Sequence, residues 1–104
     1  MDFQLEEKGQ LVTILLAGEL DMSVSEQLGQ LVRTQGRQHE RIDIDFAAVS
    51  FVDSAGIGSI FFAAKELLAN GKQVEIINIQ EEIYDILQVL GFGEALGLTL
   101  RKAN

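Results

Sequence analysis

Residues 46–60 read Phe-Ala-Ala-Val-Ser-Phe-Val-Asp-Ser-Ala-Gly-Ile-Gly-Ser-Ile, and this stretch joins two segments of different periodicity. Before it, residues 41–46 alternate between polar and apolar, as expected of a strand with one buried face. After it, apolar side chains recur at helical spacing, which predicts an amphipathic helix with the inner face Ile57, Ile60, Phe61, Ala64 and Leu68. The sequence therefore places Asp53 and Ser54 where a strand gives way to a helix.

Ser54 is predicted to lie at or near the N-cap of this helix. A serine there accepts a hydrogen bond from a backbone amide that has no partner inside the helix. A phosphate group attached at the same position would meet free N–H groups and the positive end of the helix dipole. From the local pattern alone, a structural cap is the more ordinary role, and a modifiable switch is the alternative.

The rest of the chain alternates between predicted strands and helices. Strands are expected at residues 3–7, 11–17, 41–46, 74–79 and 98–100. Helices are expected from residue 24 to about residue 36, from about residue 54 to residue 70, and over residues 81–90. Ser23 and Glu26 have capping-box spacing, which predicts Ser23 as the N-cap of the first helix. Asn70 and Gly71 predict the end of the second.

This order predicts an α/β fold with right-handed crossovers. We expect a single domain over residues 1–104, with a mixed, largely parallel sheet of four to five strands and three or more helices. Binding sites in such sheets gather beyond the carboxyl ends of the strands. Two predicted loops qualify, residues 18–21 and residues 52–56. If their strands are neighbours, Asp21 and Asp53 lie close to Ser54.

Composition narrows the class of partner. The chain has 104 residues, 47% of them apolar, no cysteine and a formal net charge of −8. This charge repels nucleic acid and anionic membranes, so we expect partners with neutral or basic faces. The first residues lack the features of a signal peptide, and no apolar run is long enough for a membrane span. We therefore expect a cytoplasmic protein without direct membrane insertion.

The sequence does not favour an enzyme, and we expect no catalytic residue, cofactor or metal site. A serine hydrolase needs a base beside its nucleophile, yet the single histidine, His39, falls in a polar link and is predicted to lie on the surface. Ser54 does not sit in a Gly-x-Ser-x-Gly elbow, because Val52 stands at the first glycine position. A two-component receiver would need an acidic pair after its first strand and a late lysine, and neither pattern is present.

Three motifs resemble the bacterial anti-sigma-factor antagonists built on the STAS domain: Gly18-Glu19-Leu20-Asp21, Asp45-Phe46 and the run from Phe51 to Gly58. The resemblance extends from Phe3 to Leu100 and implies a partner exchange controlled by phosphorylation. In that family the serine directly after the aspartate is phosphorylated by an anti-sigma factor that is itself an ATP-dependent serine kinase, and Ser54 matches it. The unmodified antagonist sequesters the anti-sigma factor, and a separate serine phosphatase resets it.

Four residues form the predicted environment of the phosphosite: Asp21, Asp53, Ala55 and Gly56. The two carboxylates would oppose an added phosphate, although a turn-forming role is favoured for Asp21. Ala55 departs from the family pattern, because many relatives carry a second hydroxyl there. The stretch after Leu98 is also too short for the final helix that many relatives have.

The outer side of the second predicted helix carries small residues and one aromatic side chain. Gly58 and Ser59 leave the backbone open to close approach, and Phe62 offers an apolar anchor about one to two turns from Ser54. We predict that these four residues form one docking strip for a protein partner. The alternative is that Phe62 packs beneath a neighbouring loop or helix.

Two functions are left open by the sequence. The first is the sigma-regulating switch. The second is a STAS adaptor or regulatory subunit of a transporter or signalling scaffold, in which Ser54 serves only as a cap.

Overall fold

A computed structural model of the chain describes residues 1–92 and 97–104. Strands and helices alternate along it in the order β1 (Asp2–Lys8), β2 (Leu11–Leu20), η1 (Met22–Val24), α1 (Ser25–Gln38), β3 (Arg41–Val52), α2 (Ser54–Ala69), β4 (Gln73–Ile79), α3 (Glu81–Val89) and β5 (Thr99–Lys102). Here η1 is a short 3-10 helix. This order confirms the predicted α/β fold.

The strands form one mixed sheet in the order β1-β2-β3-β4-β5. β1 and β2 make an antiparallel hairpin, and β2 to β5 run parallel to one another. β2 continues through Leu20, because its ladder with β3 persists across two register shifts, the second between Gly18 and Glu19. Residues 18–20 therefore belong to a strand and not to the predicted loop. The carboxyl ends of β2 and β3 lie side by side.

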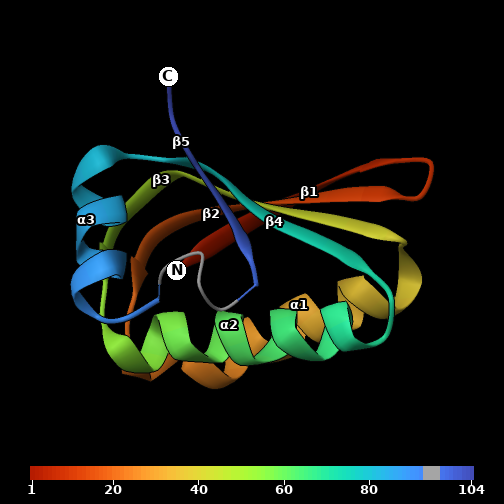
Figure 1. Ribbon diagram of the computed structural model, residues 1–104, viewed down its shortest axis with the longest axis horizontal. Coiled ribbons are helices and arrows are strands. Elements are labelled where there is room, and N and C mark those ends of the chain that lie inside the picture. Colours follow the sequence, from red (N-terminus) through yellow and green to blue (C-terminus); the bar gives the residue numbers. More distant parts are fainter. Residues whose placement is uncertain (93–96) are drawn as a thin grey trace.

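Helices α1 and α2 lie side by side on one face of the sheet, and α3 packs at the end where β3 leads into α2 (Figure 1). The core fills the space between the helices and the sheet, and its largest fully buried side chains include Phe46, Phe61, Ile14, Leu16, Leu20 and Leu28. On α2 the buried leucine is Leu67, whereas Leu68, predicted to face inward, is only partly buried. The inner face of α2 is thus rotated slightly from the predicted one.

The other face of the sheet carries ion pairs in place of helices, within the described part of the chain. Arg41 Nη2 lies 2.7 Å from Glu75 Oε2, and Arg101 Nη2 lies 2.9 Å from Glu75 Oε1. Asp43, which is register partner to Glu75, lies 3.3 Å from Arg41 Nε. Parallel sheets are usually covered on both faces. Here the paired charges allow one face to meet water.

The first helix begins later than predicted. Asp21 Oδ1 accepts hydrogen bonds from the backbone N–H and the hydroxyl of Ser23, which holds this segment in η1. The capping box predicted for Ser23 and Glu26 is therefore wrong, and α1 starts only at Ser25. The end of α2 agrees with the prediction, with Asn70 as its C-cap residue.

A glycine in α1 sets the distance between the two large helices. A Cβ atom on Gly36 would lie 2.3 Å from Cδ1 and 2.9 Å from Cγ of Leu67. Leu67 is 5% exposed, so its side chain has little room to move aside. Elsewhere along the contact, Arg33 Nε lies 2.9 Å from Glu66 Oε2. The close approach of α1 and α2 therefore requires a residue without a side chain at position 36.

Gly36→Ala tests this contact. We expect the free energy of unfolding to fall by about 1–3 kcal/mol, because overpacking against Leu67 outweighs the gain in helix propensity of up to about 1 kcal/mol. In a double-mutant cycle measured by urea denaturation, the combination with Leu67→Ala should lose less than the sum of the single changes. Strict additivity would contradict the proposed clash.

Candidate functional site

The carboxyl ends of β2 and β3 are joined through Asp53. Its N–H donates to Leu20 O at 3.2 Å, and its Oδ2 accepts from the N–H of Met22 at 3.1 Å. Asp21 stands between these two residues in the chain. The expectation that both aspartates lie at one end of the sheet, beside Ser54, is therefore met, because the parallel pairing of β2 with β3 brings their ends together.

Asp53, and not Ser54, is the N-cap of α2. Its backbone is extended, with φ −121° and ψ 174°, and its Oδ1 accepts from the N–H of Gly56 at 2.8 Å. Aspartate is as good an N-cap as serine. Ser54 is the first residue of the helix and is exposed, as is Ala55. Because the carboxylate already supplies the cap, the Ser54 hydroxyl is not required for it.

Gly56 allows α2 to start directly against β2. A Cβ atom at this position would lie 2.0 Å from the carbonyl oxygen of Leu20 and 2.9 Å from the backbone nitrogen of Asp21. These are backbone atoms, held by the hydrogen bond from Asp53 to Leu20. Only glycine fits, so Gly56 sets where the helix begins relative to the sheet and thereby where Ser54 is presented.

Asp21 makes local contacts that agree with the turn-forming role favoured for it. The Ser23 hydroxyl donates to its carboxylate and, as the largest effect, holds the pKa of Asp21 below its usual range. The backbone N–H of Ser23 contributes in the same direction. Asp21 therefore stays ionised at the end of β2, and its charge lies beside the start of α2.

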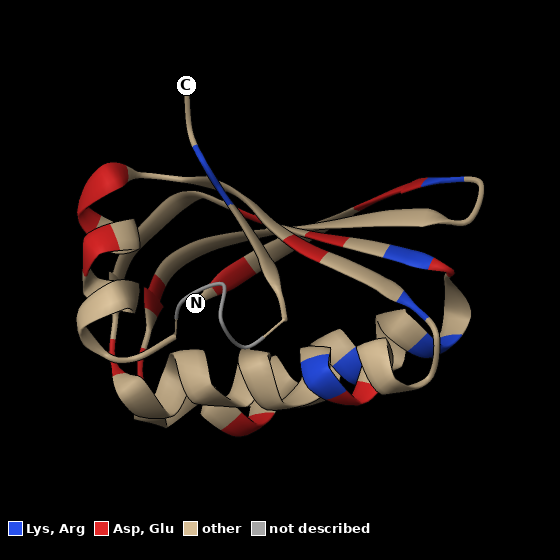
Figure 2. Ribbon diagram, viewed as in Figure 1, with Lys and Arg blue, Asp and Glu red and all other residues tan. Residues whose placement is uncertain are grey.

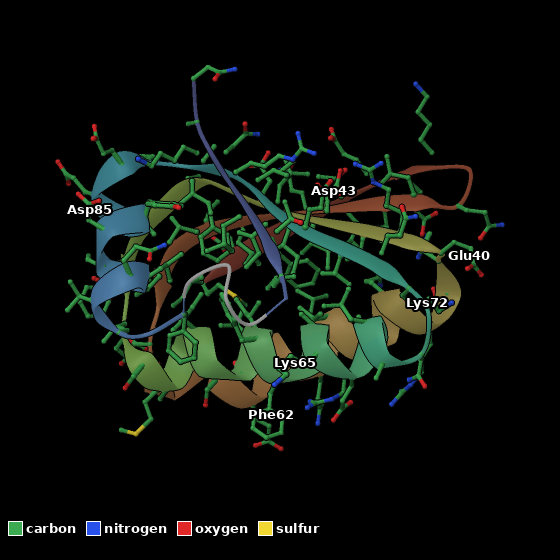
Figure 3. All side chains as sticks on the ribbon, in the orientation of Figure 1. Glu40, Asp43, Phe62, Lys65, Lys72 and Asp85 are labelled. Atoms are coloured by element: carbon green, nitrogen blue, oxygen red, sulfur yellow. The ribbon has the colours of Figure 1, made fainter. Side chains whose placement is uncertain are left out.

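The residues predicted as a docking strip lie on α2. Phe62 is 70% exposed and projects away from the sheet, as does Lys65 one turn along (Figure 3). Gly58 and Ser59 are partly buried, and the Ser59 hydroxyl donates to Gly56 O at 2.8 Å. The alternative that Phe62 packs beneath a neighbouring loop or helix is wrong for the described structure.

Two exposed apolar residues at this end of the sheet escaped the sequence reasoning. Met22 is 73% exposed, and its backbone N–H contacts Asp53. Phe51 is 45% exposed and pairs in register with Glu19 on β2. The sequence signal for Met22 was its position shortly after a strand. That signal did not distinguish an exposed apolar residue from a residue of the core.

Charge is distributed unevenly over the molecule. Asp and Glu lie on α3 and at the end of the sheet where α2 begins (Figure 2). Lys and Arg lie mainly toward the opposite end of the sheet and on the later parts of α1 and α2 (Figure 2). In the described residues no three side chains of the metal-binding types come together. An exposed hydroxyl on an acidic edge, beside apolar side chains, is suited to protein binding and modification.

His39 is not on the surface, in contrast to the prediction. Its side chain is 6% exposed, and it follows α1 directly, at the start of β3 and therefore at the end of the sheet remote from Ser54. The polar sequence around it suggested a solvated link. The ring has neighbours on two elements, because Glu7 Oε1 of β1 lies 3.3 Å from its Nε2 and Gln35 O of α1 lies 2.9 Å from its Nδ1.

Comparisons with known proteins agree with this fold. A family model described as "STAS domain" matches residues 2–103. The anti-sigma factor antagonist SpoIIAA in its unphosphorylated form is 29% identical, with 99% of this chain and 90% of that chain covered and a TM-score of 0.71. The Bacillus cell fate determinant SpoIIAA in its phosphorylated form is 28% identical, with coverage of 99% and 92% and a TM-score of 0.72. Murine Slc26a9, an anion transporter, shares the fold at 21% identity, with 95% of this chain and 17% of that chain covered and a TM-score of 0.74.

Gly56→Ala and Gly58→Ala form a matched pair that tests the close contact at the start of α2. Gly56→Ala should lower the free energy of unfolding by about 3 kcal/mol, because the clash is with backbone atoms. Gly58→Ala should leave it unchanged or raise it by up to about 1 kcal/mol, because its Cβ would lie 3.7 Å from Phe92 Cζ, an ordinary contact. The free energy of unfolding of both variants is measured by denaturant unfolding. Similar losses of stability for the two would contradict the close contact assigned to Gly56.

Proposed function

The chain belongs to the STAS domain family, and on that basis we propose that it is an anti-sigma-factor antagonist whose partner binding is switched by phosphorylation of Ser54. The observation that carries the proposal is the division of roles at the start of α2. Asp53 caps the helix, while the neighbouring hydroxyl is exposed and is not needed for the cap. Ser54 can therefore carry a modification without loss of the cap.

A phosphate on Ser54 would change the surface more than the fold. It adds roughly −1.5 to −2 charge and three acceptor oxygens. The N-terminus of α2 tolerates this charge, with a dipole effect on the order of 0.3–1 kcal/mol at an exposed site. Asp21 and Asp53 oppose it at the same edge. A partner shaped for the hydroxyl would meet a bulky dianion on an already acidic surface, and like-charge contacts at an interface cost several kcal/mol.

The proposed cycle has three participants besides this protein. An anti-sigma factor with serine kinase activity binds the unmodified form and later phosphorylates Ser54, a sigma factor is free while the anti-sigma factor is sequestered, and a serine phosphatase restores the hydroxyl. The docking surface beside Ser54 consists of Gly58, Ser59 and Phe62. We expect the protein to act in the cytoplasm and to catalyse no reaction itself.

The second candidate is a STAS adaptor or a regulatory subunit of a transporter. The likeness to Slc26a9 favours it only at the level of the fold, because the identity is 21%. In the described residues no helix has the length and the apolar character needed to cross a bilayer. The adaptor function needs no modification of Ser54, so phosphorylation separates the two candidates.

Incubation with a cognate anti-sigma factor and ATP should place one phosphate on Ser54, detected by mass spectrometry and abolished in Ser54→Ala. Ser54→Asp should fold normally and bind that partner about a hundredfold more weakly, a loss of about 3 kcal/mol. Ser50→Asp is the matched control, because it adds the same charge to the exposed Ser50 on β3 and should change affinity little. Unchanged binding by Ser54→Asp would overturn the charge mechanism.

Phe62→Ala tests the docking strip. Removal of a central aromatic anchor is expected to weaken partner binding by about 2 kcal/mol, or about thirtyfold in Kd. Stability should change by less than about 0.5 kcal/mol, since the side chain is 70% exposed. Phe3→Ala, on β1 and 41% exposed, serves as the control and should bind as the wild type does. Isothermal titration calorimetry measures the affinity of the partner for the wild type and for each of the two variants. Equal affinities for all three proteins would refute the docking strip.

A further inference from the structure

The chain's single histidine links three elements at the end of the sheet remote from Ser54. His39 follows the last residue of α1 and is 6% exposed. Its Nδ1 lies 2.9 Å from the backbone oxygen of Gln35 in α1. Its Nε2 lies 3.3 Å from Oε1 of Glu7 in β1. The ring thus joins the β1–β2 hairpin to the end of α1 and the start of β3.

Both neighbours of the ring are hydrogen-bond acceptors. A backbone carbonyl and an ionised carboxylate can only accept, whereas a neutral imidazole has a single N–H to donate. Only the protonated ring has an N–H on each nitrogen, so that it can donate to Gln35 O and at the same time present an N–H and a positive charge to the Glu7 carboxylate. We propose that protonated His39 is a clamp that holds the β1–β2 hairpin against the end of α1, and that the clamp opens when the ring loses its proton.

The surroundings of the ring determine the sign of the effect. The Glu7 carboxylate faces one nitrogen of the ring, and a carbonyl at the end of α1 faces the other. The other charged residues at this corner are Lys8, Arg37 and Arg41, together with Glu40 and Lys72, which lie close to each other in Figure 3. Glu40 Oε1 is 3.5 Å from Lys72 Nζ, and Arg41 pairs with Asp43 and Glu75. Among the charged residues that the structure describes, Glu7 is the one paired with the ring.

Loss of the proton would loosen an edge strand. All of β1 is exposed, and its ladder is with β2 alone in the described structure. A neutral ring that donates to Gln35 presents the lone pair of Nε2 to the carboxylate of Glu7, so the contact with β1 becomes repulsive. The stabilisation is therefore present while the ring is protonated and is lost when the ring gives up its proton. This gives the hairpin a sensitivity to pH that is independent of Ser54.

Amide hydrogen exchange of β1 tests the clamp. Protection factors are measured at about pH 5.5 and about pH 8, on either side of the ordinary histidine pKa of about 6.5, and corrected for intrinsic rates. In the wild type, β1 protection should fall about fivefold at the higher pH, the ratio for a contact of about 1 kcal/mol. Glu7→Gln should remove this dependence, because its amide can donate to the neutral ring. Glu6→Gln should retain it, since Glu6 pairs with Thr13 and lies on the other face of β1.

Nitrogen NMR of the single imidazole provides the second measurement, and Glu7 is 60% exposed, so Glu7→Gln should fold normally. We expect N–H groups on both ring nitrogens at the lower pH and the Nδ1–H tautomer at the higher pH. A neutral ring protonated on Nε2, or the same change in β1 protection in the wild type and in Glu7→Gln, would overturn the proposal.

Discussion

The backbone of α2 lies against the carbonyl oxygen of Leu20, and the position of the corner that carries Asp53 and Ser54 depends on this contact. The contact exists only because residue 56 has no side chain. Asp53 reinforces it by donating its N–H to Leu20 O and accepting from Met22 and Gly56 through its two carboxylate oxygens. These interactions tie the first turn of α2 to the ends of two adjacent strands. The position of Ser54 is therefore determined by backbone contacts that its own side chain does not make.

In this arrangement one residue, Asp53, stabilises the start of α2, and a different residue, Ser54, carries the exposed hydroxyl. The carboxylate of Asp53 does the capping, and an aspartate at an N-cap keeps that role whatever is attached to its neighbour. The Ser54 hydroxyl lies outside the contact between α2 and β2. A change in the charge of Ser54 therefore alters the acidic surface at this end of the sheet (Figure 2) more than it alters the packing of the core.

Much of the fold could be predicted from periodicity, because alternation at 41–46 and helical spacing after Ser54 are local properties of the chain. The α/β order and the approach of the two aspartates followed from them. The choice of Asp53 over Ser54 as the cap could not be predicted, since both residues cap well and a hydrogen bond to Leu20 on another strand decides between them. The burial of His39 was missed for a similar reason, because its neighbours in sequence are polar and its contact with Glu7 joins residues far apart in the chain.

The one-sided placement of the helices has an evolutionary consequence. The strands β3 to β5 carry paired charges on the side of the sheet away from the helices, within the part of the chain that the structure describes. An additional module could be appended over that surface while the corner at Asp53 kept its geometry. Such modularity would help to explain how one scaffold occurs both as a small free-standing regulator and as a minor part of a much larger transporter.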